Sequence, residues 1–117
     1  MLDDEGITMK KNISYDSGVD AITVEISPKK SDITVELTEN VLVDMTNERK
    51  IVGIEILDAS RELSKLFGRV ISIKEIQQLL CHFEPEAGND YLIQFESPRK
   101  KERANLLFSL YKSPILA

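Results

Sequence analysis

The sequence contains few of the residues that form disulfides, bind metals or take part in catalysis. Its 117 residues include one cysteine, one histidine and no tryptophan. A lone cysteine cannot form an internal disulfide, so a reducing cytoplasm is the expected location. A structural zinc site needs four ligands, most often from Cys and His, and this chain offers one of each. We therefore expect no metal centre of that kind.

Long apolar runs are also missing. No segment approaches the roughly 20 apolar residues that a membrane-spanning helix needs. The first residues are acidic and lack the basic and apolar regions of a signal peptide. Apolar residues make up 42% of the chain and charged residues 30%, which is ordinary for a globular protein with its own core. A membrane partner is not expected.

The charge is spread unevenly along the chain. The net charge is −5. Residues 1–60 carry 13 acids and 6 bases, whereas residues 61–117 carry 7 acids and 9 bases. A nucleic-acid-binding protein usually concentrates basic residues on one face. The acidic first half and the mildly basic second half make nucleic acid an unlikely partner.

Alternation of apolar and polar residues predicts strands in the first half. Residues 21–26, 33–37, 41–45 and 51–56 alternate at period two, and residues 13–16 suit a short edge strand. Residues 1–12 show no periodicity and are expected to form a flexible leader. Because the loops are short, the prediction is an antiparallel β-meander in which each strand pairs with the next, so that Ile26 faces Ile33.

This register gives the sheet one apolar face and one acidic face. The apolar face holds three rows of aliphatic side chains. The opposite face carries four carboxylates and no lysine or arginine from the strands: Glu25, Glu36, Asp44 and Glu55. One interpretation is a solvated sheet face. The other is a surface for a basic protein partner, or for a small ligand or divalent cation held by Glu25, Asp44 and Glu55, since opposed like charges are destabilising unless a partner relieves them.

A strand that runs directly into a helix is the most distinctive motif. Residues 52–60 read Val-Gly-Ile-Glu-Ile-Leu-Asp-Ala-Ser, in which a glycine inside a strand indicates a bulge or a close backbone approach. Asp58 is the expected N-cap of a helix over residues 59–67, which Gly68 ends.

These residues also carry a family likeness. Together with Tyr15-Asp16, residues 19–22 (Val-Asp-Ala-Ile) and Val43-Asp44, the motif resembles the prokaryotic family known as domain of unknown function 2283, over about residues 13–60. Members usually have an aspartate-rich turn with a glycine before the last strand, whereas residues 47–50 here lack glycine. The resemblance implies a small meander followed by a helix, and no activity. Such proteins are often suspected of being antitoxin-like partners of small toxins.

The second half mixes helix and strand signals. Ser72 and Glu75 form a capping box that predicts a helix to about Cys81. Residues 91–96 alternate as a strand, and Pro98 opens a predicted C-terminal helix to about Tyr111. The fold class expected is therefore α+β: a meander of four or five strands, then helices, one further strand and a C-terminal helix. We expect residues 13–68 and 69–117 to pack as one unit.

Three features of the second half are candidate sites. Cys81 and His82 are adjacent and would not face each other on a helix, so we expect a buried thiol at a helix end and a surface imidazole. The basic cluster comprises Arg99, Lys100, Lys101 and Arg103; it is either a solvated helix start or a contact for an acidic surface or a phosphate. The predicted C-terminal helix is apolar over much of its circumference, which predicts a homodimer interface through Leu106, Leu107, Phe108, Leu110 and Tyr111.

No arrangement typical of an enzyme is visible. The chain has no glycine-rich phosphate loop and no plausible Ser-His-Asp set. We therefore expect a non-enzymatic protein without a cofactor that acts through protein contacts as a homodimer and resembles an antitoxin. The alternative is a small-ligand or divalent-cation-binding module that uses the acidic sheet face.

Overall fold

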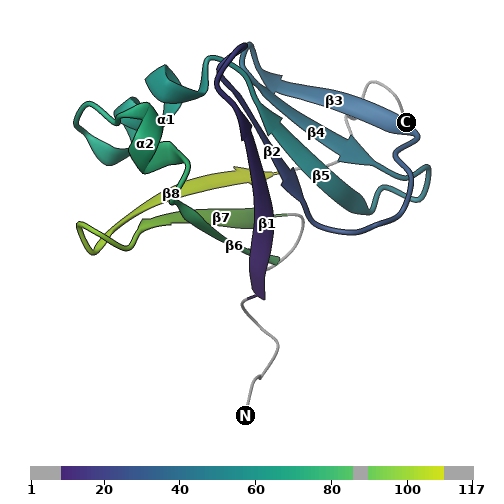
Figure 1. Cartoon of the computed structure of the whole chain (residues 1–117). Helices are drawn as coiled ribbons and strands as arrows, with labels where there is room; N and C mark the ends of the chain where they lie inside the picture. Colours follow the sequence, from purple (N-terminus) through teal and green to yellow (C-terminus); the bar gives the residue numbers. More distant parts are fainter. Residues whose placement is uncertain (1–8, 86–89, 110–117) are drawn as a thin grey trace.

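The computed structural model describes residues 9–85 and 90–109, which form an α+β fold (Figure 1). The first half contributes five strands: β1 (Met9–Asp16), β2 (Ala21–Glu25), β3 (Ile33–Thr38), β4 (Val41–Met45) and β5 (Ile51–Ile56). The second half contributes two helices and three strands: α1 (Ala59–Phe67), α2 (Ile73–Ile76), β6 (Leu80–Pro85), β7 (Asp90–Ser97) and β8 (Glu102–Ser109). Neither helix is long and apolar enough to cross a bilayer.

Strand β1 joins two antiparallel sheets. Its residues 12–16 pair with β2 in the five-stranded sheet, whereas its residues 9–11 pair with β6 in the three-stranded sheet. The order is β3-β4-β5-β2-β1-β6-β7-β8. The expected short edge strand is therefore a central one, and it begins at Met9, inside the segment expected to be a leader; residues 1–8 lie outside the described residues.

The strand order differs from the predicted meander at one connection. The pairs β3–β4 and β4–β5 form as expected, but β2 pairs with β5 instead of β3. The backbone N–H of Ile26 donates to the carbonyl of Val52 in β5 at 3.0 Å. Ile33, which was expected to face Ile26, pairs with Met45 in β4. Residues 26–32 therefore carry the chain across the sheet to the edge strand β3 and do not close a hairpin.

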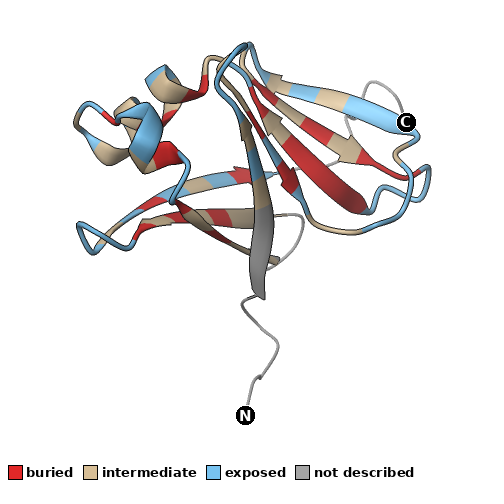
Figure 2. Ribbon diagram, viewed as in Figure 1, coloured by how far each residue is buried: buried red, intermediate tan, exposed pale blue. Residues whose placement is uncertain are grey.

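The core lies between the inner faces of the two sheets (Figure 2). Alternation places the buried side chains of β2 and β4 on the inner face, as predicted, because the period of a strand fixes its faces whatever its neighbour is. In β5 the register shift leaves both Ile51 and Val52 buried. Cross-strand pairs align Val35, Val43, Ile54 and Val24 in one apolar row. Fully buried residues of the second sheet complete the core: Cys81, Ile93 and Phe95.

Helix α1 has the predicted bounds but an unexpected cap. Asp58 occupies the N-cap position and makes no side-chain capping hydrogen bond. Asp20, in the β1–β2 turn, accepts hydrogen bonds from the backbone N–H of Ser60 at 3.1 Å and from its hydroxyl at 2.7 Å. The hydroxyl of Tyr15 donates to the same carboxylate at 2.7 Å. A residue far away in the sequence thus caps the helix and ties it to the first hairpin.

The electrostatics of this cap follow from its hydrogen bonds. Burial opposes the negative charge of Asp20, but the hydrogen bonds from Tyr15 and Ser60 outweigh it and hold the pKa of Asp20 below its usual value. Burial and the neighbouring carboxylate raise the pKa of the Tyr15 hydroxyl to about 12. Both groups therefore keep the protonation states that the network needs at neutral pH.

The structure corrects two predicted helices. Ser72 does cap α2 by accepting the N–H of Glu75 at 3.1 Å, but the helix ends at Ile76 and the chain enters β6 at Leu80. The predicted strand over residues 91–96 is confirmed within β7. The helix predicted to begin at Pro98 is wrong, because Glu102–Ser109 pairs along its length with β7 as strand β8. Residues 110–117, including Leu110 and Tyr111, lie outside the described residues.

The cap can be tested with two matched substitutions. Asp20 and Asp58 both have left-handed backbones, with φ of 54° and 52°, so alanine carries the same backbone cost at each. We expect Asp20→Ala to destabilise the fold by roughly 1–3 kcal/mol more than Asp58→Ala, because only Asp20 accepts capping hydrogen bonds. Urea unfolding of both variants would measure the difference.

The same pair of variants predicts a pH dependence. Since the folded state lowers the pKa of Asp20, its stabilisation is present above the ordinary value of 3.8 and is lost as the pH falls through the folded value. The difference between the two variants should therefore shrink in acid. Equal stabilities of the two variants at neutral pH would contradict the cap.

Candidate functional site

The outer face of the five-stranded sheet carries all four carboxylates predicted for it. One cross-strand row places Asp44 beside Gly53, which in turn lies beside Glu25. The next row places Leu42 between Glu36 and Glu55. The residues of the face are as predicted, but their order is not, because β2 lies beside β5. Glu25 and Asp44 consequently flank the same glycine.

Asp44 and Glu55 form the most strongly interacting pair on this face. A hydrogen bond to Asp44, partial burial and the charge of Asp44 raise the pKa of Glu55 above its usual value. The hydroxyl of Thr34 donates to Asp44 at 2.7 Å from the neighbouring strand. Asp44 therefore accepts a hydrogen bond from Thr34, and Glu55 resists ionisation beside it.

Gly53 explains how this pair fits into the sheet. A Cβ at this position would lie 3.3 Å from the carbonyl oxygen of Val24 and 3.7 Å from a carboxylate oxygen of Asp44. The register also shifts here, since Asp44 pairs with Gly53 while Met45 pairs with Ile51. The predicted bulge and close backbone approach are both present, and the missing side chain leaves room for the carbonyl of Val24 on β2.

The carboxylates of the acidic face are not balanced by ion pairs within the described part of the chain. Glu25 and Glu36 are exposed, and Asp44 and Glu55 are half-buried. Within residues 9–85 and 90–109, none of these four carboxylates forms an ion pair with a lysine or arginine. The same residues contain no group of three or more His, Cys, Asp or Glu side chains placed to hold a metal ion. The surface can receive positive charge, and its chemistry suits a basic partner.

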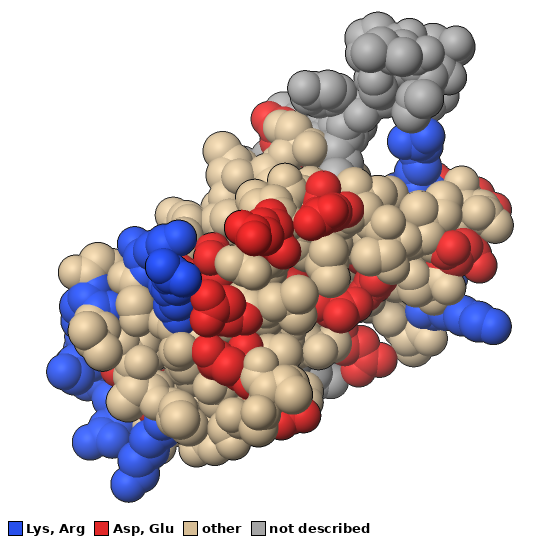
Figure 3. Space-filling view, turned by 90° about the horizontal axis from the view of Figure 1, so that it is seen from above, with Lys and Arg blue, Asp and Glu red and all other residues tan. Residues whose placement is uncertain are grey.

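The sequence predicted that the basic cluster lies at the start of a helix, and the structure corrects this. Arg99, Lys100 and Lys101 lie in the turn between β7 and β8, and Arg103 lies in β8 at 4.0 Å from Glu96. The two sets of charge occupy different regions of the surface. Figure 3 shows many basic side chains at one end of the molecule and a few at the other, with acidic side chains over the middle.

Cys81 and His82 point to opposite sides of β6. The thiol of Cys81 is fully buried in the core, as expected, although on a strand and not at a helix end. His82 is half-buried on the outer face, with Nε2 at 3.3 Å from Oε1 of Glu96. The thiol and the imidazole are therefore separated by the strand itself and cannot form a nucleophile and base.

The predicted dimer residues divide between two faces of β8. Leu106 and Phe108 point into the core, where the ring of Phe108 stacks on Tyr91 at 5.7 Å. Leu107 points outward and is 64% exposed. A strand presents alternate residues to each side, so the continuous apolar surface predicted from helical spacing does not form.

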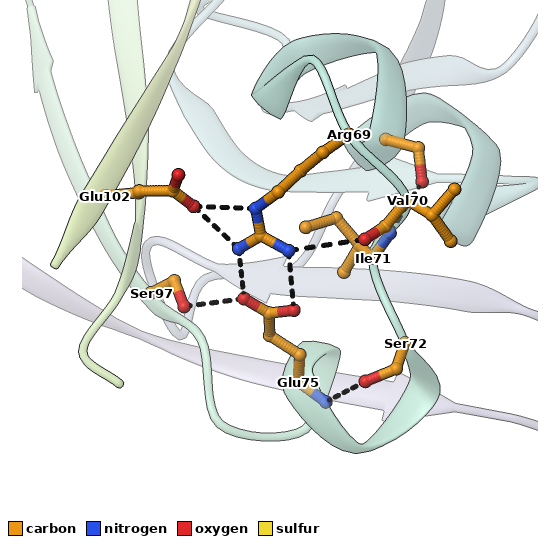
Figure 4. A network of polar contacts seen from close by, with 8 residues as sticks. Arg69, Val70, Ile71, Ser72, Glu75, Ser97 and Glu102 are labelled. Carbon is orange, nitrogen blue, oxygen red and sulfur yellow. Dashed lines mark hydrogen bonds and ion pairs between the residues drawn. The ribbon is translucent and has the colours of Figure 1, made fainter. Parts of the chain in front are cut away.

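The sequence also gave no indication that Arg69 would bind Glu75 and Glu102 (Figure 4).

The carboxyl pair predicts a stability effect. The folded state raises the pKa of Glu55, so ionisation of this group reduces stability above the folded pKa and has no effect below the ordinary value of 4.5. We expect Glu55→Gln to stabilise the protein by a few tenths of a kcal/mol near neutral pH, by removing the repulsion, and to leave it unchanged in acid. Thermal unfolding at both pH values would measure this.

Glu36→Gln is the matched control, because Glu36 lies on the same face and its carboxylate makes no described contact. A gain from Glu36→Gln as large as that from Glu55→Gln would show that overall charge, and not the Asp44–Glu55 contact, is responsible.

Comparison with known proteins bears on the first half only. A comparison with curated proteins and one with solved structures gave no match. Residues 12–60 match a family model described as "Protein of unknown function (DUF2283)". The match covers residues 12–16 of β1, strands β2 to β5 and the start of α1, including the capping residues Asp20 and Ser60. The predicted resemblance is confirmed: residues 12–60 of this chain are similar to the DUF2283 family.

Proposed function

We propose that this protein is a non-enzymatic binding module of the cytoplasm that holds a small basic protein against its acidic sheet face. The observation that carries the proposal is the imbalance on that face, where Glu25, Glu36, Asp44 and Glu55 have no described cationic partner. Folding needs polar residues on an outer sheet face, but it does not need them to be of one sign. A basic partner would relieve the repulsion, which costs roughly 0.2–1 kcal/mol for opposed like charges.

The raised pKa of Glu55 supports this interpretation. A carboxyl that resists ionisation beside Asp44 would release its proton when a cation approaches, and binding would then gain a charge-assisted contact. A partner that covers the face in the manner of an antitoxin and a small toxin fits these contacts. Its binding would weaken as salt increases, because the exposed carboxylates are screened.

Charge reversal tests the proposal. Glu25 and Glu36 are both exposed, so Glu25→Lys with Glu36→Lys should leave the fold intact while abolishing recovery of a small basic protein from the source cells. The control reverses Glu39 and Glu48, which are exposed in the turns beside β4 and change the net charge equally. Quantitative mass spectrometry of proteins captured by the full chain would compare the variants.

The outcomes separate the candidate functions. A basic protein lost with the face variant and kept with the control supports the proposal. Equal loss in both variants would indicate unspecific charge attraction and overturn it. Thermal stabilisation by a divalent cation, lost in Asp44→Asn, would instead favour the cation-binding alternative.

We also propose that the protein is a homodimer in which the β8 edges of two copies pair. Among the described strands β8 is an edge of the sheet. Its central residues are apolar, and its outward side chain Leu107 lies opposite Leu92 on the neighbouring strand. A long apolar edge is normally blunted by charge or covered by another chain. In β8, Arg103 places a charge near one end of the strand and does not cover its apolar centre.

Leu107→Lys tests the dimer. A charge on the exposed edge should leave the monomer folded and prevent pairing, while Val19→Lys, at a 69% exposed position in the β1–β2 turn, should not. Light scattering after size-exclusion chromatography should give twice the chain mass of 13.3 kDa for the wild type and one chain mass for Leu107→Lys. A wild-type monomer at micromolar concentration contradicts the dimer.

A further inference from the structure

A cavity of about 330 Å³ lies at the end of the molecule that is remote from the acidic sheet face. Three segments form it: the loop after α1, the short helix α2 and the turn between β7 and β8. The polar side chains that line it are Arg69, Ser72, Lys74, Glu75, Arg99 and Lys100. Its volume is at the lower end of the range of about 300–1,000 Å³ that small-molecule sites occupy.

The lining is strongly basic in an acidic protein. Four of these side chains are cationic and one is a carboxylate, so the lining carries a net charge of +3, whereas the whole chain carries −5. The one carboxylate is already engaged. Glu75 accepts hydrogen bonds from Arg69 and, at 2.8 Å, from the hydroxyl of the buried Ser97. Arg69 holds the pKa of Glu75 at about 2, so Glu75 stays ionised and bound to it.

Arg69 itself is used by the fold. Figure 4 shows its guanidinium between two carboxylates. Nη1 donates to Glu75 at 3.0 Å, and Nε donates to Glu102 at 2.7 Å; Nη1 also donates to the carbonyl of Val70 at 3.2 Å. A guanidinium has five N–H donors. Most of them are occupied here, so this network fixes the wall of the cavity and contributes little new binding capacity.

The other three cationic side chains that line the cavity are not held in ion pairs. Lys74, Arg99 and Lys100 form no ion pair with any carboxylate in residues 9–85 and 90–109. They come from two segments that are distant in sequence, and the Arg69–Glu75–Glu102 network brings these segments together around one cavity. The charge of Lys100 contributes to the lowered pKa of Glu75. Nothing in the fold requires all three cations to converge, because each would be hydrated equally well on an open surface.

We infer that this cavity binds a small phosphorylated molecule through Lys74, Arg99 and Lys100. Phosphate oxygens accept charge-assisted hydrogen bonds, in which arginine supplies a planar pair of donors and lysine a point charge. The convergence on one cavity favours a small ligand over a long polyanion. Figure 3 shows acidic side chains next to the basic end, and these would repel an extended nucleic acid.

Binding to inorganic pyrophosphate and to ADP, measured by isothermal titration calorimetry on the full chain, tests the inference. We expect saturable binding of one equivalent that weakens as salt increases. Arg99→Gln with Lys100→Gln should weaken it by about a hundredfold or more, because each of the two lost charge-assisted contacts accounts for about tenfold or more. Thermal unfolding without ligand should be nearly unchanged, since these side chains lie in an exposed turn.

The sequence supplies a matched control in the same basic cluster. Lys101→Gln with Arg103→Gln removes the same charge from adjacent positions that do not line the cavity. This control should bind within about twofold of the wild type, because only overall charge has changed. Equal weakening in both double variants would show diffuse attraction and overturn the inference. Failure of both probes to saturate at millimolar concentration would also overturn it.

These outcomes do not depend on the acidic face. The variants with Glu25 and Glu36 reversed should bind pyrophosphate normally, so the inferred site and the proposed protein partner can fail separately.

Discussion

The divided pairing of β1 is the constraint on which the rest of the structure depends. One end of this strand continues the five-stranded sheet and the other end begins the three-stranded sheet, so a single backbone fixes how the two sheets meet. Their apolar faces are thereby turned toward each other, and the buried side chains of both form one core. The outer faces must then be polar or covered. The acidic surface is exposed because the opposite side of the same strands is used for the core.

The faces of β2 to β5 could be predicted, whereas their order could not. Alternation at period two assigns each side chain to a face but does not identify the neighbouring strand. Val24 and Ile54 were therefore expected on one face whether or not β2 and β5 pair. The connection from β2 to β3 decides the order, and residues 26–32 are long enough either to close a loop or to cross the sheet. Short loops favour hairpins, and here that preference gave the wrong neighbour.

The second half shows where local signals compete. Leu106, Leu107 and Phe108 are consecutive apolar residues, which suit a buried helix as well as a strand. Pairing with β7 along Glu102–Ser109 decides for the strand. The capping box at Ser72 was read correctly as a helix start, but Glu75 turns to Arg69, and the helix is short. Similarly, Asp58 had the right residue type for a cap, while Asp20 provides the hydrogen bonds. Contacts between distant residues are not visible in a local pattern.

The same reasoning distinguishes the two proposed sites. The acidic face could be predicted because its residues follow from strand periodicity alone. The basic cavity could not, because it depends on a network that joins Arg69 to Glu102 across the fold. Both gather charge of one sign: four carboxylates share one face, and Lys74, Arg99 and Lys100 share one cavity. Departures from local rules without a structural benefit concentrate at functional sites. The opposite signs of the two proposed sites match their two proposed occupants, a basic protein surface and a small anion, which could therefore bind without competing for the same residues.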